Sequence, residues 1–267
     1  MPDCLVLIPY HEAGEKLLAS LDSIVDPGQR LEVLVVDDGS RRLPATASVD
    51  GRSWPFPVRI ETLPRNVGIA EALNHGLGYA APYTYVARLD CGDTCLPNRF
   101  RLQLDELDQH PDLLLLGGAA EFATPEGRTH LEYFPTTWAG VLRRLRVNSA
   151  FLHPSVVFRS AVIDRVGLYP VDRPAAEDYA WFWSIAKVGE ARSLRDVVLR
   201  YEIDPDAISS LHRRRQIRSR IQVMRDNFDL TPGAVWGLVR SAVLYLSPRR
   251  AVVQVRRALA PLLRNDR

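Results

Sequence analysis

Short runs of apolar residues alternate with amphipathic segments through the first half of the chain. The run from Cys4 to Ile8 stops at Pro9, as a buried strand does at its end. The same alternation predicts strands at 4–8, 31–36, 58–63 and 84–89, and helices at 17–25, at 69–80 and from Pro97 onward. Continuous apolar strands separated by helices predict an α/β fold, in which a doubly wound, mostly parallel sheet is flanked by helices.

The pattern is less regular in the second half and becomes helical near its end. Apolar runs predict strands at 113–116, 155–159 and 197–203, and a helix at 178–188. After residue 208, apolar residues recur at the spacing of one helix face. The sequence therefore predicts an α/β domain over residues 1–210 and a helical C-terminal appendage over residues 211–267.

Charge divides the chain at the same place. The net charge of the 267 residues is only +2, but residues 1–210 hold 21 basic against 29 acidic residues, and residues 211–267 hold 13 against 3. Hydrophobic residues make up 46% and charged residues 25% of the chain, which excludes a disordered or collagen-like protein. An acidic body with a basic tail indicates two tasks on one chain.

The number of cysteines and the lengths of the apolar runs indicate the cellular compartment of the protein. The three cysteines, Cys4, Cys91 and Cys95, cannot all pair, which favours a reducing environment. The sequence has no basic-then-apolar leader, and no apolar run of the roughly 18 to 20 residues that cross a bilayer. We therefore expect a cytoplasmic protein, with peripheral attachment to the inner face of the plasma membrane as an option.

Polar clusters follow three of the predicted strands, at 9–12, 37–40 and 90–93. Because ligands bind beyond the carboxyl ends of parallel strands, we expect these clusters to meet at one rim of the sheet. Clustered carboxylates can hold a divalent cation that stabilises a departing nucleoside diphosphate. A further carboxylate can deprotonate an incoming hydroxyl, and Glu177-Asp178 is the best candidate. Each cluster also suits a plain turn or a helix cap.

The sequence lacks the signatures of other nucleotide-binding sites, of a hydrolase site and of a zinc site. Residues 9–14 do not supply the Gly-x-Gly-x-x-Gly of a Rossmann site, and no P-loop sequence is present. There is no Gly-x-Ser-x-Gly elbow. Cys91 and Cys95 lack a second Cys/His pair, so a zinc site is not expected.

Six short segments, taken in order, resemble the motifs of the family 2 inverting glycosyltransferases. They are residues 8–12 (IPYHE), 35–40 (VVDDGS), 65–70 (RNVGIA), 88–93 (RLDCGD), 153–159 (HPSVVFR) and 176–179 (AEDY). The resemblance spans about residues 4–215. It implies the GT-A fold, one doubly wound nucleotide-binding domain merged with an acceptor-binding part. It also implies transfer of a sugar from a nucleotide-diphosphate-sugar to an acceptor hydroxyl with inversion, in bacterial-type polysaccharide or glycolipid assembly.

The resemblance also assigns roles to individual residues. Asp37 or Asp38 would contact the base of the nucleotide-sugar, and Asp178, with Glu177 beside it, would be the general base. Asp90 and Asp93 would hold Mg²⁺ or Mn²⁺ together with the diphosphate. The remaining residues expected around the nucleotide-sugar are Pro9, Tyr10, Glu12, Arg65, Asn66 and Arg88.

One position departs from the family pattern. The metal segment of the family reads Asp-x-Asp-Asp, and its third position is Gly92 in this chain. Two carboxylates remain, so the cation could still be held through Asp93 and the diphosphate. It could also be unnecessary if Arg88 or arginines of the tail neutralise the charge. We expect turnover that depends on Mg²⁺ or Mn²⁺.

Two histidines are candidates for the acceptor side. His153 precedes Pro154 and is otherwise a structural histidine. His212 lies where the family has a loop near the diphosphate.

The tail combines arginines with apolar positions. From residue 248 onward, five arginines recur at intervals that place them on one helical arc, and residues 235–246 are apolar on one face, with Trp236 and Tyr245. Basic and apolar helices with aromatic residues fit the interface of an anionic membrane, so residues 231–267 are a candidate membrane-binding segment. The alternative is packing on the catalytic body. The acidic body argues against nucleic acid as a partner.

Three functions remain open at this point. The leading one is a glycosyltransferase acting on a saccharide or a lipid-linked saccharide. A non-catalytic sugar-nucleotide-binding or scaffold protein on the same fold is the second, which Gly92 keeps open. A nucleotidyltransferase is the third, and residues 9–14 match its expected loop poorly.

Overall fold

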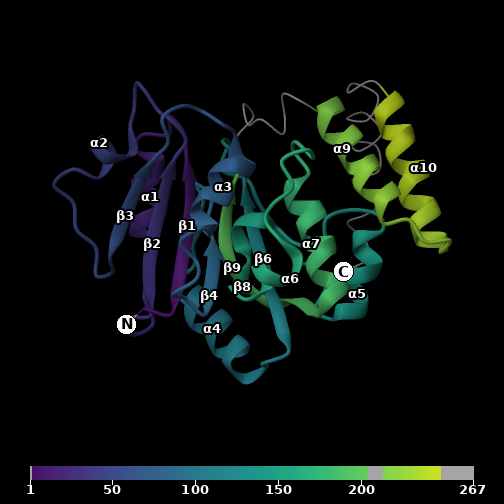
Figure 1. Cartoon of the computed structure of the whole chain (residues 1–267), viewed down its shortest axis with the longest axis horizontal. Helices are drawn as coiled ribbons and strands as arrows, with labels where there is room; N and C mark the ends of the chain where they lie inside the picture. Colours follow the sequence, from purple (N-terminus) through teal and green to yellow (C-terminus); the bar gives the residue numbers. More distant parts are fainter. Residues whose placement is uncertain (1, 204–212, 248–267) are drawn as a thin grey trace.

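One nine-stranded sheet forms the centre of the molecule (Figure 1). The computed structural model describes residues 2–203 and 213–247. The strands follow one another in the sheet in the order β3-β2-β1-β4-β8-β6-β9-β5, and β7 pairs with β6. Their bounds are β1 Cys4–Tyr10, β2 Leu31–Asp37, β3 Val58–Thr62, β4 Tyr85–Arg88, β5 Thr94–Cys95, β6 Leu113–Ala123, β7 Thr129–Glu132, β8 Val157–Arg159 and β9 Glu190–Glu202.

Most of the sheet runs in one direction. Strands β3, β2, β1 and β4 run parallel to one another, and β6 is parallel to β9. The short strand β8 lies antiparallel between β4 and β6, so these two strands share one direction. Strands β5 and β7 run against their neighbours at the far side. The prediction of a mostly parallel α/β sheet flanked by helices is confirmed.

Helices cover both faces of the sheet. Their bounds are α1 Lys16–Asp22, α2 Ala45–Val49, α3 Ile69–Leu77, α4 Arg99–Gln109, α5 Trp138–Leu145, α6 Val162–Val166, α7 Glu177–Val188, α9 Arg213–Asp226 and α10 Pro232–Leu246. Side chains of β1 alternate between the two layers, because successive residues of a strand point to opposite faces. Val6 packs in the apolar cluster that contains the buried faces of α1 and α4, whereas Leu7 packs in the cluster that contains α3, α5 and α7.

Several elements differ from the sequence prediction. The first helix ends at Asp22 and not at residue 25, and Ser155 belongs to a short 3-10 turn, His153–Ser155, ahead of β8. Strand β6 continues past residue 116 through Gly117 and Gly118, residues that weaken a strand prediction. A Cβ on Gly118 would lie 2.4 Å from a methyl carbon of Val198, so glycine there lets β9 pack closely. The two-residue strand β5, the polar strand β7 and helices α2, α5 and α6 were not predicted.

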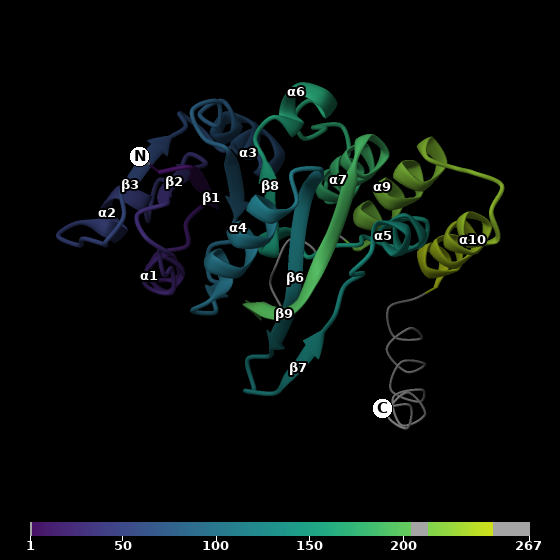
Figure 2. The same ribbon diagram turned by 90° about the horizontal axis from the view of Figure 1, so that it is seen from below.

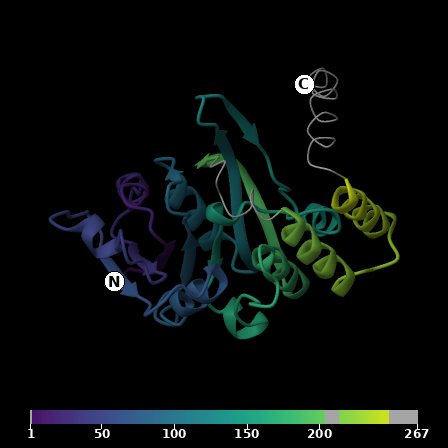
Figure 3. The same cartoon turned by 90° about the horizontal axis from the view of Figure 1, so that it is seen from above.

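Helices α9 and α10 form a pair at the end of the molecule opposite α2, with α10 on the outside (Figures 2 and 3). Val223 and Met224 of α9 join the core cluster of α7. The backbone of α10 meets the end of α5 at Gly237, where a Cβ would lie 2.0 Å from the carbonyl oxygen of Arg146. Within residues 2–203 and 213–247, no helix is both long enough and apolar enough to cross a membrane.

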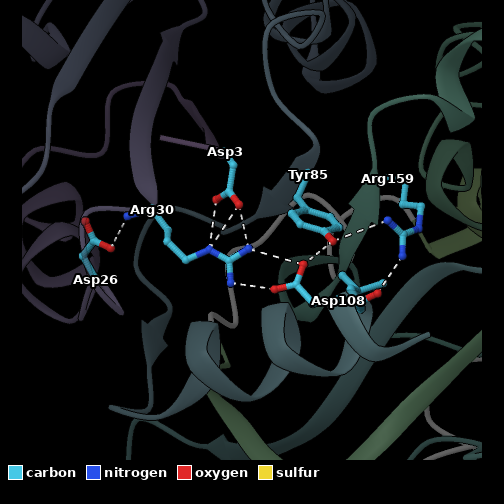
Figure 4. Close-up of polar contacts among 7 residues, drawn as sticks. Asp3, Asp26, Arg30, Tyr85, Asp108 and Arg159 are labelled. Atoms are coloured by element: carbon cyan, nitrogen blue, oxygen red, sulfur yellow. Dashed lines mark hydrogen bonds and ion pairs between the residues drawn. The ribbon is translucent and has the colours of Figure 1, made fainter. Parts of the chain in front are cut away.

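A polar network closes the amino-terminal edge of the sheet (Figure 4). Arg30 lies between Asp3 and Asp108 and forms an ion pair with each, at 2.6 Å and 2.9 Å. The hydroxyl of Tyr85 donates to Asp108 at 2.6 Å. Arg159 donates at 2.6 Å to the carbonyl oxygen of Leu107, in the last turn of α4. This network ties the starts of β1, β2 and β4 to α4.

Candidate active site

The loops after β1, β2 and β3 meet at the carboxyl edge of the sheet. The backbone N–H of Asp38 donates to the carbonyl oxygen of Tyr10 at 2.8 Å. Gly39 has a φ of +69°, and a Cβ there would lie 2.3 Å from the backbone of Arg65. The close approach of these loops requires glycine, because only glycine combines this φ with no side chain. The structure thus brings residues 9–12, 37–40 and 65–66 together.

Asp37 and Asp38 build this edge through backbone hydrogen bonds. Asp37 is fully buried and accepts from the N–H groups of Ser40 and Ala45 at 2.9 Å and 2.8 Å. Asp38 accepts from the N–H groups of Val67 and Gly68 at 2.7 Å and 2.9 Å. Each carboxylate oxygen retains a lone pair, but Asp37 has no exposed surface, so of the two only Asp38, 5% exposed, has surface from which to accept from a ligand.

Tyr10 and Glu12 shape the neighbouring loop. The buried hydroxyl of Tyr10 donates to the carbonyl oxygen of Leu43, and the N–H of Gly14 donates to it at 2.9 Å. Hydrogen bonds from the backbone N–H groups of residues 41–43 lower the pKa of Glu12 to about 2. Its carboxylate is therefore ionised and holds the 41–43 segment.

The other predicted donor residues differ in exposure. Pro9 is partly exposed near the end of β1, and Arg65 and Asn66 are exposed on their loop. Arg88, by contrast, is 1% exposed. Its guanidinium forms an ion pair with Asp90 and donates to the carbonyl oxygens of Leu7 and Leu89. The buried guanidinium of Arg88 therefore holds the side chain of Asp90 in place through this ion pair.

Asp93 carries an unsatisfied buried oxygen. Its Oδ1 accepts from the backbone N–H of Glu202 at 3.0 Å, and its Oδ2 has no hydrogen-bond partner among the described residues. Burial, together with the negative charge of Asp90, raises the pKa of Asp93 to about 8. The two carboxylates are thus close enough to oppose each other's ionisation.

Glu177 and Asp178 stand at the start of α7. Glu177 is 6% exposed, and its Oε2 has no hydrogen-bond partner in the described part of the chain. Burial and the charge of Asp178 raise the pKa of Glu177 to about 7. Asp178 is half-buried, and burial also raises its pKa, while the N–H of Tyr179 and the charge of Arg220 oppose the shift. The charge of Asp90 acts on Asp178 as well, so the residue predicted as the base lies within electrostatic range of the predicted metal segment.

The residues present fit a divalent cation only with help from a ligand. Within residues 2–203 and 213–247, no group of three or more His, Cys, Asp or Glu side chains is arranged to hold a metal ion. Asp93, however, has a buried oxygen without a hydrogen-bond partner among the described residues, and Asp90 has a partly exposed carboxylate. A cation would relieve the repulsion between these two carboxylates. The remaining ligands would be diphosphate and water oxygens, which Mg²⁺ prefers to an all-protein cage.

The backbone explains why position 92 is glycine. Gly92 has a φ of +104°, a conformation that L side chains rarely adopt. A Cβ there would point to the stem of Lys16 at 3.5 Å. An aspartate at this position would be strained, so the departure from the family pattern is built into the turn.

The structure places His153 in the aromatic core. It is 8% exposed, and its Nε2 lies 3.0 Å from the hydroxyl of Tyr169. Burial, with the charge of Arg88, lowers the pKa of His153 well below its usual value, so the ring is neutral. His212 lies outside the described residues.

Ser20 is a site residue that sequence reasoning missed. Its hydroxyl accepts from the N–H of Gly92 at 2.8 Å and donates to the carbonyl oxygen of Asp93 at 2.8 Å, so α1 holds the turn of the metal segment. The available signal was a serine between Leu17 and Leu21 on the apolar face of the first predicted helix. A buried polar group on such a face needs a partner.

Comparison with known proteins identifies the class. The profile of glycosyl transferase family 2 matches residues 5–166, more than half of the chain. The chain therefore belongs to this family, and it is a glycosyltransferase.

Relatives cover most of the chain. The amylovoran biosynthesis glycosyltransferase AmsE of Erwinia amylovora is 29% identical over 91% of this chain and 90% of its own length. An Escherichia coli UDP-Gal:alpha-D-GlcNAc-diphosphoundecaprenol beta-1,3-galactosyltransferase is 30% identical over 63% of this chain and 61% of its own.

Solved structures share the fold. The mannosyltransferase PcManGT from Pyrobaculum calidifontis, in complex with GDP-Man and Mn²⁺, has a TM-score of 0.67 at 19% identity, over 98% of this chain and 81% of its own. S. aureus TarS 1–349, in complex with UDP-GlcNAc, has a TM-score of 0.68 at 16% identity, over 92% and 73%. The fold is GT-A, as predicted.

Proposed function

We propose that this glycosyltransferase moves a sugar from a nucleotide-diphosphate-sugar to a hydroxyl of a saccharide or lipid-linked saccharide, with inversion at the anomeric carbon. The observation that carries this proposal is the convergence of Asp90, Asp93, Glu177 and Asp178 at the carboxyl edge of the sheet, with raised pKa values for three of them. Perturbed carboxylates of this kind cluster at functional sites.

The donor would lie across the loops after β1, β2 and β4. The base would face the loops held by Asp37 and Asp38, beside Arg65 and Asn66. The diphosphate would lie at Asp90 and Asp93, above the buried guanidinium of Arg88. Pro9, Tyr10 and Glu12 would complete the nucleotide pocket.

Asp178 would act as the general base. The acceptor oxygen attacks the anomeric carbon as the bond from that carbon to the phosphate oxygen breaks, and the hydroxyl proton passes to Asp178. The electron pair of the broken bond leaves with the nucleoside diphosphate. Glu177 is buried beside Asp178, whose charge helps to raise the pKa of Glu177 to about 7.

We also propose that Asp93 and Asp90 hold Mg²⁺ or Mn²⁺ when the donor binds. The cation would neutralise the charge that develops on the leaving diphosphate. The orphaned Oδ2 of Asp93 supports this assignment. The solved structure of PcManGT, which shares the fold, is a complex with GDP-Man and Mn²⁺. Full activity of this chain in excess EDTA would contradict the assignment.

Polysaccharide or glycolipid assembly is the proposed biological setting. The relatives named above include an amylovoran biosynthesis protein and an enzyme named for a diphosphoundecaprenol-linked acceptor. A cytoplasmic location at the inner face of the membrane, where such acceptors would be reached, follows as part of the proposal.

Residues 211–267 would form an appendage that attaches the catalytic domain, residues 1–210, to an anionic membrane. Helix α10 leaves Val235, Trp236, Val239 and Val243 exposed on its outer side. The arginine arc predicted from residue 248 onward lies outside the described residues. A chain truncated near residue 230 should lose co-sedimentation with anionic vesicles, and full retention would contradict the proposal.

The decisive experiment separates an enzyme from a binding protein. Asp178→Asn should lower kcat by about 10²–10⁴-fold, because it removes the base. It should leave the thermal shift caused by the donor unchanged, because the donor loops are intact. A screen of nucleotide-sugars with and without Mn²⁺ identifies the donor first. Unchanged turnover in Asp178→Asn would overturn the proposed mechanism.

A further inference from the structure

One side chain of α1 holds the backbone of the predicted metal segment, residues 90–93. The hydroxyl of Ser20 accepts from the N–H of Gly92 and lies near two carbonyl oxygens, that of Asp93 at 2.8 Å and that of Asp90 at 3.3 Å. Because a hydroxyl has a single proton, it donates mainly to the nearer oxygen, that of Asp93. One hydroxyl therefore fixes the turn between the two candidate metal ligands.

The burial of Ser20 makes these bonds difficult to replace. Ser20 has no exposed surface, and its neighbours Leu17 and Leu21 pack in the core cluster that contains one face of β1. Solvent does not reach the hydroxyl, so an alanine there would remove the bonds to Gly92 and Asp93 without offering water in exchange. The loss of a buried hydrogen-bond partner is more costly than the loss of an exposed one.

The turn depends on this bond because its own geometry is permissive. Within the turn, the N–H of Asp93 donates to the carbonyl oxygen of Asp90 at the longer distance of 3.1 Å. Gly92 has a φ of +104°, and glycine loses more conformational freedom on ordering than any other residue. The N–H of Glu202 holds the side chain of Asp93 through Oδ1, whereas Ser20 holds its backbone. Ser20 thus supplies order that the glycine does not.

The chain just before α1 is anchored to the loops expected around the nucleotide. The N–H of Gly14 donates to the hydroxyl of Tyr10 at 2.9 Å, and that hydroxyl donates to the carbonyl oxygen of Leu43. Helix α1 therefore connects the nucleotide loops at one end to the metal segment, through Ser20, at the other. A change in the bond from Ser20 would alter how these two parts of the donor site are placed.

We propose that Ser20 is a positioning residue, which holds the turn so that the carboxylates of Asp90 and Asp93 are ready to bind a divalent cation together with the donor diphosphate. With glycine at position 92, the segment offers two carboxylates, so the affinity for the cation depends on how well these two are held in advance. This inference rests on the proposed function, since it concerns the cation and diphosphate site proposed above.

The binding test uses the full chain and inorganic pyrophosphate, titrated by calorimetry once with Mn²⁺ and once with EDTA. The measured quantity is the gain in pyrophosphate affinity that Mn²⁺ provides. Ser20→Ala should reduce this gain by at least about fivefold, because the turn loses its buried hydrogen bonds. Ser20→Thr keeps the hydroxyl and should recover most of the gain.

Ser23→Ala is the matched control. Ser23 directly follows α1, and its hydroxyl accepts from the N–H of Cys95 at 2.9 Å, two residues beyond Asp93. This variant also loses a serine hydroxyl that binds a backbone N–H, but it should keep the Mn²⁺-dependent gain within about twofold of wild type. Urea unfolding of every variant separates a loss of stability from a loss of affinity.

Three outcomes would overturn the role of Ser20 alone: an undiminished gain in Ser20→Ala, an equal loss in Ser23→Ala, or a loss in Ser20→Thr as large as in Ser20→Ala. If Ser20→Ala does not fold, Ser20→Cys takes its place with the same expected loss, because a thiol is a weak donor and acceptor. A wild-type chain without any Mn²⁺-dependent gain would contradict the cation site itself, and the role of Ser20 with it. Because the measurement needs no turnover, these failures are distinct from failure of the Asp178→Asn test.

Discussion

The pKa values of carboxylates at the two edges of the sheet are shifted in opposite directions. At the amino-terminal edge, hydrogen bonds from Tyr85 and Arg30 outweigh partial burial and lower the pKa of Asp108. At the carboxyl edge, burial and neighbouring carboxylates raise the pKa values of Asp93 and Glu177, and each keeps an oxygen without a hydrogen-bond partner in the part of the chain that the structure describes. The first arrangement stabilises the fold, and the second stores an unfavourable interaction that a ligand can relieve.

Gly39→Ala should give the largest effect. Gly39 has a φ of +69°, and the Cβ of an alanine there would lie 2.3 Å from the Arg65 backbone, so the substitution would force the donor loops apart. We expect a loss of about 3 kcal/mol of stability and weaker donor binding. Gly28→Ala, near the opposite edge, is the control: its φ is +100°, but no atom lies within 4 Å of the added Cβ. Similar donor affinities in the two variants would show that the loop contact is unimportant. Urea unfolding and a donor titration provide the measurements.

Asp93 and Asp108 should shift stability with pH in opposite directions. Folded Asp93 keeps a proton up to about pH 8, while the unfolded chain releases it near its ordinary pKa of 3.8. The free energy of unfolding therefore falls as pH rises through this window, by up to about 1.4 kcal/mol per unit. Asp93→Asn should remove this slope.

Asp108 has a lowered folded pKa, so its contribution is present at neutral pH and is lost as the pH falls through that value. Asp108→Asn should therefore lower stability at pH 7 and reduce the loss seen on acidification. Urea unfolding from pH 3 to pH 9 measures both variants. Parallel pH dependences in the two variants would contradict the contrast between the edges.

Glu177→Gln should flatten the pH dependence of stability between about pH 4.5 and pH 7. Burial and the charge of Asp178 raise the pKa of folded Glu177 to about 7, so the folded state keeps a proton that the unfolded chain releases near the ordinary pKa of 4.5. The free energy of unfolding therefore falls as the pH rises through this window, and a neutral amide removes that loss. Glu202→Gln, with an exposed side chain on β9, is the control. Urea unfolding with the same slope in Glu177→Gln as in wild type would contradict the raised pKa.

Arg30→Ala should have the smallest effect and should act on stability alone. Its ion pairs with Asp3 and Asp108 are partly exposed, so we expect a loss of about 1 kcal/mol. kcat should remain within about twofold of wild type, because surface changes away from a site are nearly neutral. A larger fall in kcat would show that the two edges are coupled.

The parts of the fold that the sequence predicts are those with long, regular apolar patterns. Strands β1 and β2 are buried along almost their whole length, and α4 buries one regular face with Phe100, Leu104 and Leu107, so the periodicity of these elements is complete. Strand β7 (Thr129–Glu132) carries a mostly polar, exposed sequence, and only its pairing with β6 defines it.

The candidate site divides in the same way. Motif residues such as Asp90 and Asp178 could be selected from the sequence, because acidic groups after strands and before a helix are visible there. The backbone bonds that engage Asp38, and the orphaned oxygens of Asp93 and Glu177, depend on loops that meet only in the folded chain.

Strand β8, three residues long and reversed in direction, also has a consequence for recombination. On one side β8 pairs with β4, in the half of the sheet that carries the donor loops, through Tyr85–Arg159, Val86–Phe158 and Ala87–Val157. On the other side it pairs with β6 through two residue pairs. The family match ends at residue 166, just beyond this seam. A crossover placed in α6, just after β8, would keep the donor loops, β6 and β8 together and would exchange α7 with β9, so a chimeric enzyme would have to rebuild the pairing of β6 with β9.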